Sequence, residues 1–187
     1  ALMWGYVVRW TTDDTDLEVL GVEQEFRAEL VNPATGAASR TYALGGKLDL
    51  LVRRRSNSLV YIVEHKTTTE SIETGSVYWE TLQLDSQVST YYVGAASLGT
   101  PADGVIYDVI SRPMLKPLTA TPVEDRKYRQ KDGALYATQR ERDETPDEFR
   151  QRLFEAIAEA PDRFYRRGDV VRLASEQADA AFDTWQL

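Results

Sequence analysis

The stretch LVYIVEHK, residues 59–66, is the part of the sequence that says most about the fold. Its first six residues are largely apolar and rich in β-formers, which predicts a short strand buried in the centre of a sheet. Side chains alternate between the two faces of a strand, so Glu64 and Lys66 should share one face and His65 should point to the other. A surface ion pair would explain the same two charges, so the tripeptide alone decides little.

Patterns on both sides of this strand predict the remaining elements of an α/β fold. Aromatic residues over positions 1–10 indicate a helix, and two strands are expected at about 19–30 and 41–54, the second interrupted by Gly45-Gly46. Short turns join these strands, which favours antiparallel pairing. Apolar residues recur at helical spacing from about 79 to 98, and Gly99 is placed to end that helix. The helix can cross over to a parallel, buried strand at 104–110, which gives a mixed central sheet flanked by helices.

The C-terminal part of the sequence is harder to interpret. Residues 112–145 form a long, charge-rich excursion, in which Arg112 to Arg142 hold eight basic and four acidic residues. That local excess could follow a phosphate backbone, although a solvated loop is an equal alternative. A helix from Pro146, a short strand within 164–173 and a final helix near Ser175 follow. We expect one domain, 1–187, with its core at about 19–112 and peripheral helices and a loop at 113–187.

Composition excludes several classes of site. The 187 residues include no Cys and a single His, which excludes disulfides, thiolate metal sites, thiol catalysis and two-His mechanisms. A bound metal would need oxygen ligands, which favours Mg²⁺ or Mn²⁺. No apolar run approaches a membrane span and no signal peptide is visible, so we expect a cytoplasmic protein without a membrane partner. Ala1 in place of Met suggests a trimmed chain or a piece of a longer one.

One more acid turns the charged strand end into a candidate metal site. Asp49 lies 15 residues before Glu64 on the preceding strand, and antiparallel pairing can bring the two together. Two carboxylates and the backbone carbonyl of His65 can hold a hard cation with its waters. Such an ion activates water near neutral pH, and Lys66 could orient that water or neutralise charge on a phosphoryl group. This constellation suggests metal-dependent phosphodiester hydrolysis.

Four ordered pieces of sequence resemble the PD-(D/E)XK nuclease superfamily, within it the RecB-like and phage-type exonuclease domains. They are Val22-Glu23-Gln24-Glu25-Phe26, Gly46-Lys47-Leu48-Asp49, Val63-Glu64-His65-Lys66-Thr67-Thr68 and Gln87-x-x-x-Tyr91, and together they cover about residues 19–112. Each piece is weak alone, and the ordered set is strong. The resemblance implies a restriction-endonuclease-like core.

The resemblance also implies roles for individual acids and for one lysine. Asp49 and Glu64 match the two metal-binding acids, and Lys66 matches the catalytic lysine. Glu23 matches the acid of the first strand that helps to bind the metal or its waters, with Glu25 as the competing candidate. All three of Asp49, Glu64 and Lys66 are present, so the resemblance implies an active enzyme.

Further residues are expected to support catalysis and to contact DNA. Gln87 and Tyr91 match a helix motif that buttresses the site, and their four-residue spacing places them on one helix face. The candidate DNA contacts are Thr67, Thr68, Trp79 and Arg112. Each has an ordinary alternative: Trp79, for instance, could be a core residue instead of a platform for base stacking.

The function expected from these residues is a Mg²⁺- or Mn²⁺-dependent deoxyribonuclease, an exonuclease of phage replication or of recombination and repair. A restriction-type endonuclease and a non-catalytic DNA-end-binding domain are the alternatives. The net charge of −8 counts mildly against a DNA-binding protein. Relatives with an iron–sulfur cluster on four cysteines are excluded, and the upstream His ligand of several relatives is missing. The sequence is compatible both with a homo-oligomer and with membership of a larger recombination complex.

Overall fold

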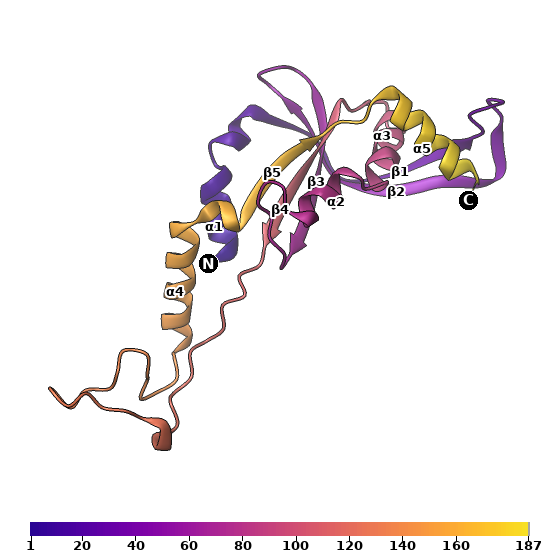
Figure 1. Cartoon of the computed structure of the whole chain (residues 1–187). Helices are drawn as coiled ribbons and strands as arrows, with labels where there is room; N and C mark the ends of the chain where they lie inside the picture. Colours follow the sequence, from indigo (N-terminus) through magenta and orange to yellow (C-terminus); the bar gives the residue numbers. More distant parts are fainter. Residues whose placement is uncertain (187) are drawn as a thin grey trace.

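The computed structural model describes residues 1–186, which build a five-stranded sheet of order β1-β2-β3-β4-β5 with helices around it (Figure 1). The strands are β1 Leu17–Val31, β2 Ala38–Arg54, β3 Val60–Thr68, β4 Gly104–Ser111 and β5 Tyr165–Val170. Neighbouring strands are antiparallel except β3 and β4, which run parallel. The predicted α/β class and mixed central sheet are therefore confirmed.

The α-helices are α1 Leu2–Trp10, α2 Val77–Gln83, α3 Gln87–Ser97, α4 Pro146–Glu159 and α5 Ala174–Gln186. Short 3-10 helices cover Asp13–Asp16, Val123–Asp125 and Pro161–Arg163. Across residues 1–186, the helices are too short or too polar to span a lipid bilayer.

Strand β3 lies in the middle of the sheet and packs on both of its faces. Ile62 belongs to the larger apolar cluster, which α3 covers with Val88 and Ala95, whereas Val63 belongs to a smaller cluster on the opposite face. The predicted central burial is confirmed. The strand continues four residues past Glu64, because its C-terminal half keeps pairing with β4 as far as the pair Thr68 and Ser111.

Strand β2 runs without a break through Gly45 and Gly46, so the predicted interruption is wrong. The two glycines pair with β1 opposite Arg27 and Phe26. A Cβ atom at position 46 would lie 2.7 Å from the Phe26 ring. That glycine makes room for an aromatic side chain and does not break the strand.

The single helix expected at about 79–98 is two helices, α2 and α3, with a break at residues 84–86. Leu84 fits the apolar spacing but is 83% exposed. The Asp85 side chain accepts a hydrogen bond from the Gln87 backbone N–H at 2.9 Å and so starts a new helix. Short acidic side chains compete in this way with helical hydrogen bonding. Gly99 follows α3 with a φ of +77°, as expected for a C-terminal glycine.

Strand β5 extends the sheet beyond the expected core of residues 19–112. It pairs with β4, and its Tyr165 packs with Trp10 of α1 and Ile157 of α4. Helix α1 therefore meets α4 and β5 at one edge of the sheet. Residues 112–145 form the predicted excursion, which projects far from the sheet and returns at the start of α4 (Figure 1).

Candidate active site

Glu64 and Lys66 lie side by side on the face of β3 that α3 covers, as the alternation of the strand predicts. Only 5% of Glu64 is exposed, because apolar residues of the larger cluster surround it. The Lys66 ammonium lies 2.8 Å from Oε1 of Glu64 and so balances the buried negative charge. A buried carboxylate with a fixed cation beside it is costly to build, which points to a functional site.

Helix α3 brings Gln87 and Tyr91 to the same place. The Lys66 ammonium donates a hydrogen bond to Oε1 of Gln87 at 2.8 Å, so Glu64 and Gln87 together fix its position. Burial raises the pKa of the Tyr91 phenol, and the neighbouring Glu64 raises it further. Tyr91 is therefore a neutral group at physiological pH. The structure thus gathers four of the predicted residues.

Asp49 reaches the site from β2, at the point where β2 and β3 separate. The last paired residues of these strands are Leu50 and Val63, so Asp49 takes the next position, opposite Glu64. Its Oδ2 accepts a hydrogen bond from the backbone N–H of His65 at 3.1 Å. That bond places the Asp49 carboxylate beside the backbone of the residue that follows Glu64.

The side chains present fit a hard divalent cation. Oε2 of Glu64 is buried and has no hydrogen-bond partner among residues 1–186. An orphaned carboxylate oxygen is costly in the interior, and a cation with oxygen ligands would satisfy it. Asp49 and the His65 backbone carbonyl are the further oxygen donors that the sequence predicted. Within the described part of the chain, no group of three His, Cys, Asp or Glu side chains forms a metal cluster, so backbone oxygen and water would complete such a site.

Glu23 stands at the register position opposite Asp49, but its carboxylate contacts the Lys47 ammonium. This contact raises the pKa of Lys47. Glu23 has a φ of +53°, which is unfavourable for a residue with a side chain, and the regular pairing of β1 skips it. The described structure therefore does not group Glu23 with Asp49 and Glu64, and its role at the metal stays a prediction.

The His65 side chain points to the face of the sheet away from Lys66, as predicted. Its Nε2 lies 3.8 Å from Oδ2 of Asp108, and its Nδ1 lies 3.7 Å from Oδ2 of Asp49. Asp108 is buried and accepts hydrogen bonds from the Tyr6 hydroxyl at 2.5 Å and from Arg167 at 2.8 Å. His65 thus lies between a polar cluster on that face and the candidate metal acid.

The four candidate DNA contacts lie in different surroundings. Thr67 and Arg112 are exposed, whereas Thr68 is buried and its hydroxyl accepts a hydrogen bond from the Glu70 N–H at 3.0 Å. Trp79 packs directly over Gly168 of β5, and the Arg166 guanidinium lies 5.2 Å from its ring centre. Thr68 and Trp79 thus have structural contacts of their own, and the role of all four in DNA binding stays a prediction.

Asp85 was not among the predicted site residues, although it positions Gln87. Its Oδ1 accepts a hydrogen bond from the Gln87 N–H at the start of α3, and its Oδ2 accepts one from the Tyr107 hydroxyl at 3.2 Å. Burial raises the pKa of Tyr107, and Asp85 raises it further. The signal in the sequence is an Asp two residues before Gln87, a spacing at which Asp side chains commonly accept a hydrogen bond from the backbone.

Comparisons with known proteins place this geometry in context. The family model described as "PD-(D/E)XK nuclease superfamily" matches residues 1–170. A search of curated proteins found no match. A solved structure entitled "Crystal structure of SSO0001" aligns with 98% of the chain at 12% identity and a TM-score of 0.40. The chain spans 57% of the length of that protein.

Proposed function

This chain belongs to the PD-(D/E)XK nuclease superfamily, and from that premise we propose that it is a Mg²⁺- or Mn²⁺-dependent deoxyribonuclease. The observation that carries the proposal is the buried Glu64, which has one oxygen held by Lys66 and the other unpartnered in the described structure. Asp49 takes the register position opposite Glu64, where the β2–β3 ladder ends, and accepts a hydrogen bond from the His65 backbone N–H.

Each residue has a defined part in this proposal. Asp49, Glu64 and the His65 backbone carbonyl would hold the ion, as the sequence led us to expect. When bound, a divalent cation supplies Lewis-acid polarisation of the phosphate and lowers the pKa of water. Lys66 has three N–H donors, two of which are directed to Glu64 and Gln87. The third is available to orient a water molecule or to stabilise charge on a phosphoryl oxygen.

The proposed substrate is DNA, cut from an end during phage replication or recombination and repair. Support for the exonuclease comes from the four sequence pieces that resemble RecB-like and phage-type domains. A restriction-type endonuclease would use the same metal site, and substrate topology separates the two. A non-catalytic DNA-end-binding domain is disfavoured, because Asp49, Glu64 and Lys66 are all present and Lys66 contacts Glu64.

The experiment is a cleavage assay on linear duplex, single-stranded and supercoiled DNA, with Mg²⁺, with Mn²⁺ and with a chelator. We expect metal-dependent degradation of linear DNA, intact supercoiled circles, and a loss of at least about a hundredfold in Asp49→Asn and Lys66→Ala. Asp13→Asn removes an exposed acid away from the site and should retain full activity. Cleavage by Lys66→Ala at the wild-type rate, or no cleavage of DNA with any metal, would refute the proposal.

A further inference from the structure

The excursion between β4 and α4 contains a segment of high local positive charge. We call residues 113–145 the arm and residues 126–140 the arm tip. The tip contains five basic residues and one acidic residue, a net charge of +4 within a chain of net charge −8. It lies at the far end of the arm, away from the sheet and the candidate active site (Figure 1).

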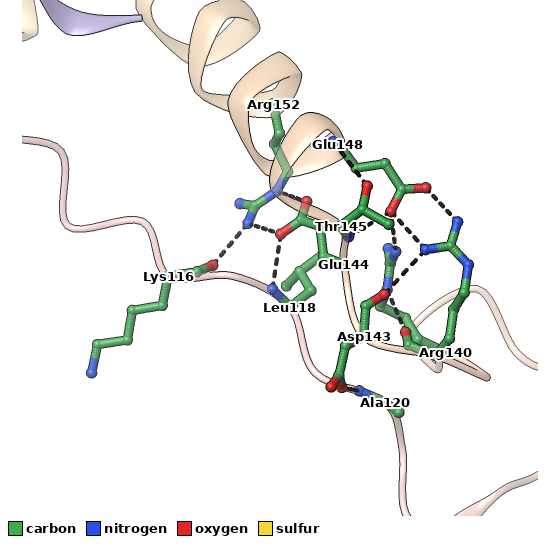
Figure 2. A network of polar contacts seen from close by, with 10 residues as sticks. Lys116, Leu118, Ala120, Arg140, Asp143, Glu144, Thr145, Glu148 and Arg152 are labelled. Carbon is green, nitrogen blue, oxygen red and sulfur yellow. Dashed lines mark hydrogen bonds and ion pairs between the residues drawn. The ribbon is translucent and has the colours of Figure 1, made fainter.

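Hydrogen bonds and ion pairs fix the base of the arm to α4. Figure 2 shows Glu144 between the guanidinium of Arg152 and the backbone N–H of Leu118, both of which donate hydrogen bonds to it at 2.8 Å. Arg152 also donates to the carbonyl of Lys116 at 2.8 Å, so a single guanidinium joins both sides of the arm to α4. The Glu144 side chain is only 3% exposed.

A second set of contacts joins the arm to the first turn of α4. Arg142 donates two hydrogen bonds to the Glu148 carboxylate. The same carboxylate accepts a hydrogen bond from the backbone N–H of Thr145 (Figure 2). The guanidinium of Arg152 lowers the pKa of Glu144 to about 2, and that of Arg142 lowers the pKa of Glu148 to about 2. Acids at the base are thus paired with arginines, while the excess of positive charge lies at the tip.

The backbone of the tip is ordered as a narrow ribbon. Tyr128 and Leu135 form an antiparallel bridge, and the Arg129 N–H donates to the carbonyl of Ala134 at 2.8 Å. Gly133 makes the turn with a φ of +67°, where a residue with a side chain would be strained. The Gln139 side chain accepts from the Lys127 N–H at 2.6 Å and ties the two sides of the ribbon together.

This ribbon presents cations and aromatic rings to solvent. Lys127, Arg129 and Lys131 are exposed, and Arg129 alone of these three pairs with an acid in the described structure, namely Asp132. Tyr128 and Tyr136 are 52% and 50% exposed, respectively. Exposed cations interleaved with exposed aromatic rings are the features that bind unpaired nucleic-acid strands, through phosphate contacts and base stacking.

We propose that the arm tip binds single-stranded DNA outside the cleavage site, with Lys127, Arg129 and Lys131 on phosphates and with bases stacked on Tyr128 and Tyr136. The choice of DNA rests on the proposed nuclease function. The binding itself follows from the charge, the exposure and the fixed ribbon. Because the tip stands away from Glu64 and Lys66, its contribution is to hold the substrate strand and not to act in the chemical step.

The test is DNA binding in the presence of a chelator, so that cleavage does not enter the measurement. Fluorescence anisotropy with a labelled single-stranded 30-mer compares the full chain with a variant carrying Lys127→Ala, Arg129→Ala and Lys131→Ala. We expect an approximately tenfold higher Kd and a salt slope reduced by about 2, since each lost phosphate contact on a single strand removes about 0.7. A second variant, Tyr128→Ala with Tyr136→Ala, should weaken single-strand binding at least about fivefold and change duplex binding less than about twofold.

A matched control removes three exposed arginines elsewhere, in the variant Arg27→Ala, Arg40→Ala and Arg55→Ala, and so changes the net charge equally. It should bind within about twofold of wild type if the effect belongs to the tip. The proposal is overturned if both triple variants lose DNA affinity equally or if the tip variant binds DNA like wild type. It is also overturned if polyglutamate competes for the protein as well as DNA does. If DNA is cleaved but the tip variants bind DNA like wild type, the proposal for the arm fails and the proposed nuclease function stands. If the tip variants bind DNA more weakly but no metal supports cleavage, the proposed nuclease function fails and the proposal for the arm stands.

Discussion

Replacing Lys66 with Met should destabilise the metal-free protein and make its stability depend on divalent cations. The Lys66 ammonium is the cation that lies 2.8 Å from the buried Glu64 carboxylate. Methionine keeps much of the side-chain volume but removes the charge. Neither oxygen of the buried Glu64 carboxyl would then contact a cation, since Oε2 already has no partner in residues 1–186.

The expected magnitude follows from the burial of the two partners. Removing one member of a fully buried ion pair costs about 3–5 kcal/mol. The Lys66 side chain is 27% exposed, so water screens part of the interaction and we expect the lower end, about 3 kcal/mol. For a chain of this size, that corresponds to a fall in Tm of about 6–12 °C. A divalent cation bound at Glu64 would replace the lost charge, so Mg²⁺ should raise the Tm of this variant more than that of wild type.

The assay is thermal and urea unfolding of four proteins in a chelator and again in Mg²⁺: wild type, Lys66→Met, Glu64→Gln and the double variant. The double variant removes both charges and should recover most of the loss, which gives a coupling energy of about 2 kcal/mol. A coupling energy below about 0.5 kcal/mol would show that Lys66 does not neutralise Glu64. Equal gains of Tm in Mg²⁺ for wild type and Glu64→Gln would contradict the assignment of Glu64 as a ligand.

Two further predictions concern Asp85 and the arm. Asp85→Ala removes the side-chain hydrogen bond to the Gln87 N–H and should lower stability by about 1 kcal/mol and cleavage about tenfold. Asp85→Asn keeps the accepting oxygen and should retain most activity, and unfolding and cleavage assays on both variants decide this. Because Glu144 and Glu148 have pKa values of about 2, below their ordinary value of 4.5, their stabilisation of the arm is complete above about pH 4.5 and is lost as the pH falls towards 2. Hydrogen exchange of residues 113–145 between pH 6 and pH 2.5 should show this loss, and protection that does not change with pH would contradict it.

Much of the sheet could be predicted because its strands carry strong local signals. The apolar run before Glu64 and the β-branched run at 104–110 are short and uninterrupted, and both are buried strands of the sheet. The positions of Glu64 and Lys66 follow from the two-residue period of a strand alone. Their contact could therefore be expected without knowledge of the surrounding fold.

Other features depend on contacts that a linear pattern does not contain. Leu84 has the right spacing for a buried helix face, yet the helix breaks there because Asp85 bonds to the Gln87 backbone. Gly46 is a residue type typical of turns, yet here its lack of a side chain leaves room for the ring of Phe26 on the neighbouring strand. Glu23 points to Lys47 because of a backbone conformation that few residues with side chains adopt. A local side-chain hydrogen bond decides the first outcome, a partner distant in sequence the second, and a local dihedral angle the third.

The packing of α1 against α4 and β5 has a consequence for biosynthesis. The Tyr165 hydroxyl donates a hydrogen bond to the Leu2 carbonyl across 163 positions, and Arg9 contacts Asp162 at 3.2 Å. At roughly 5–20 residues per second, a ribosome would deliver these partners about 8–30 s after the first helix has emerged. Throughout that interval the nascent α1 lacks the surface that buries Trp10, which makes it a candidate for transient chaperone binding.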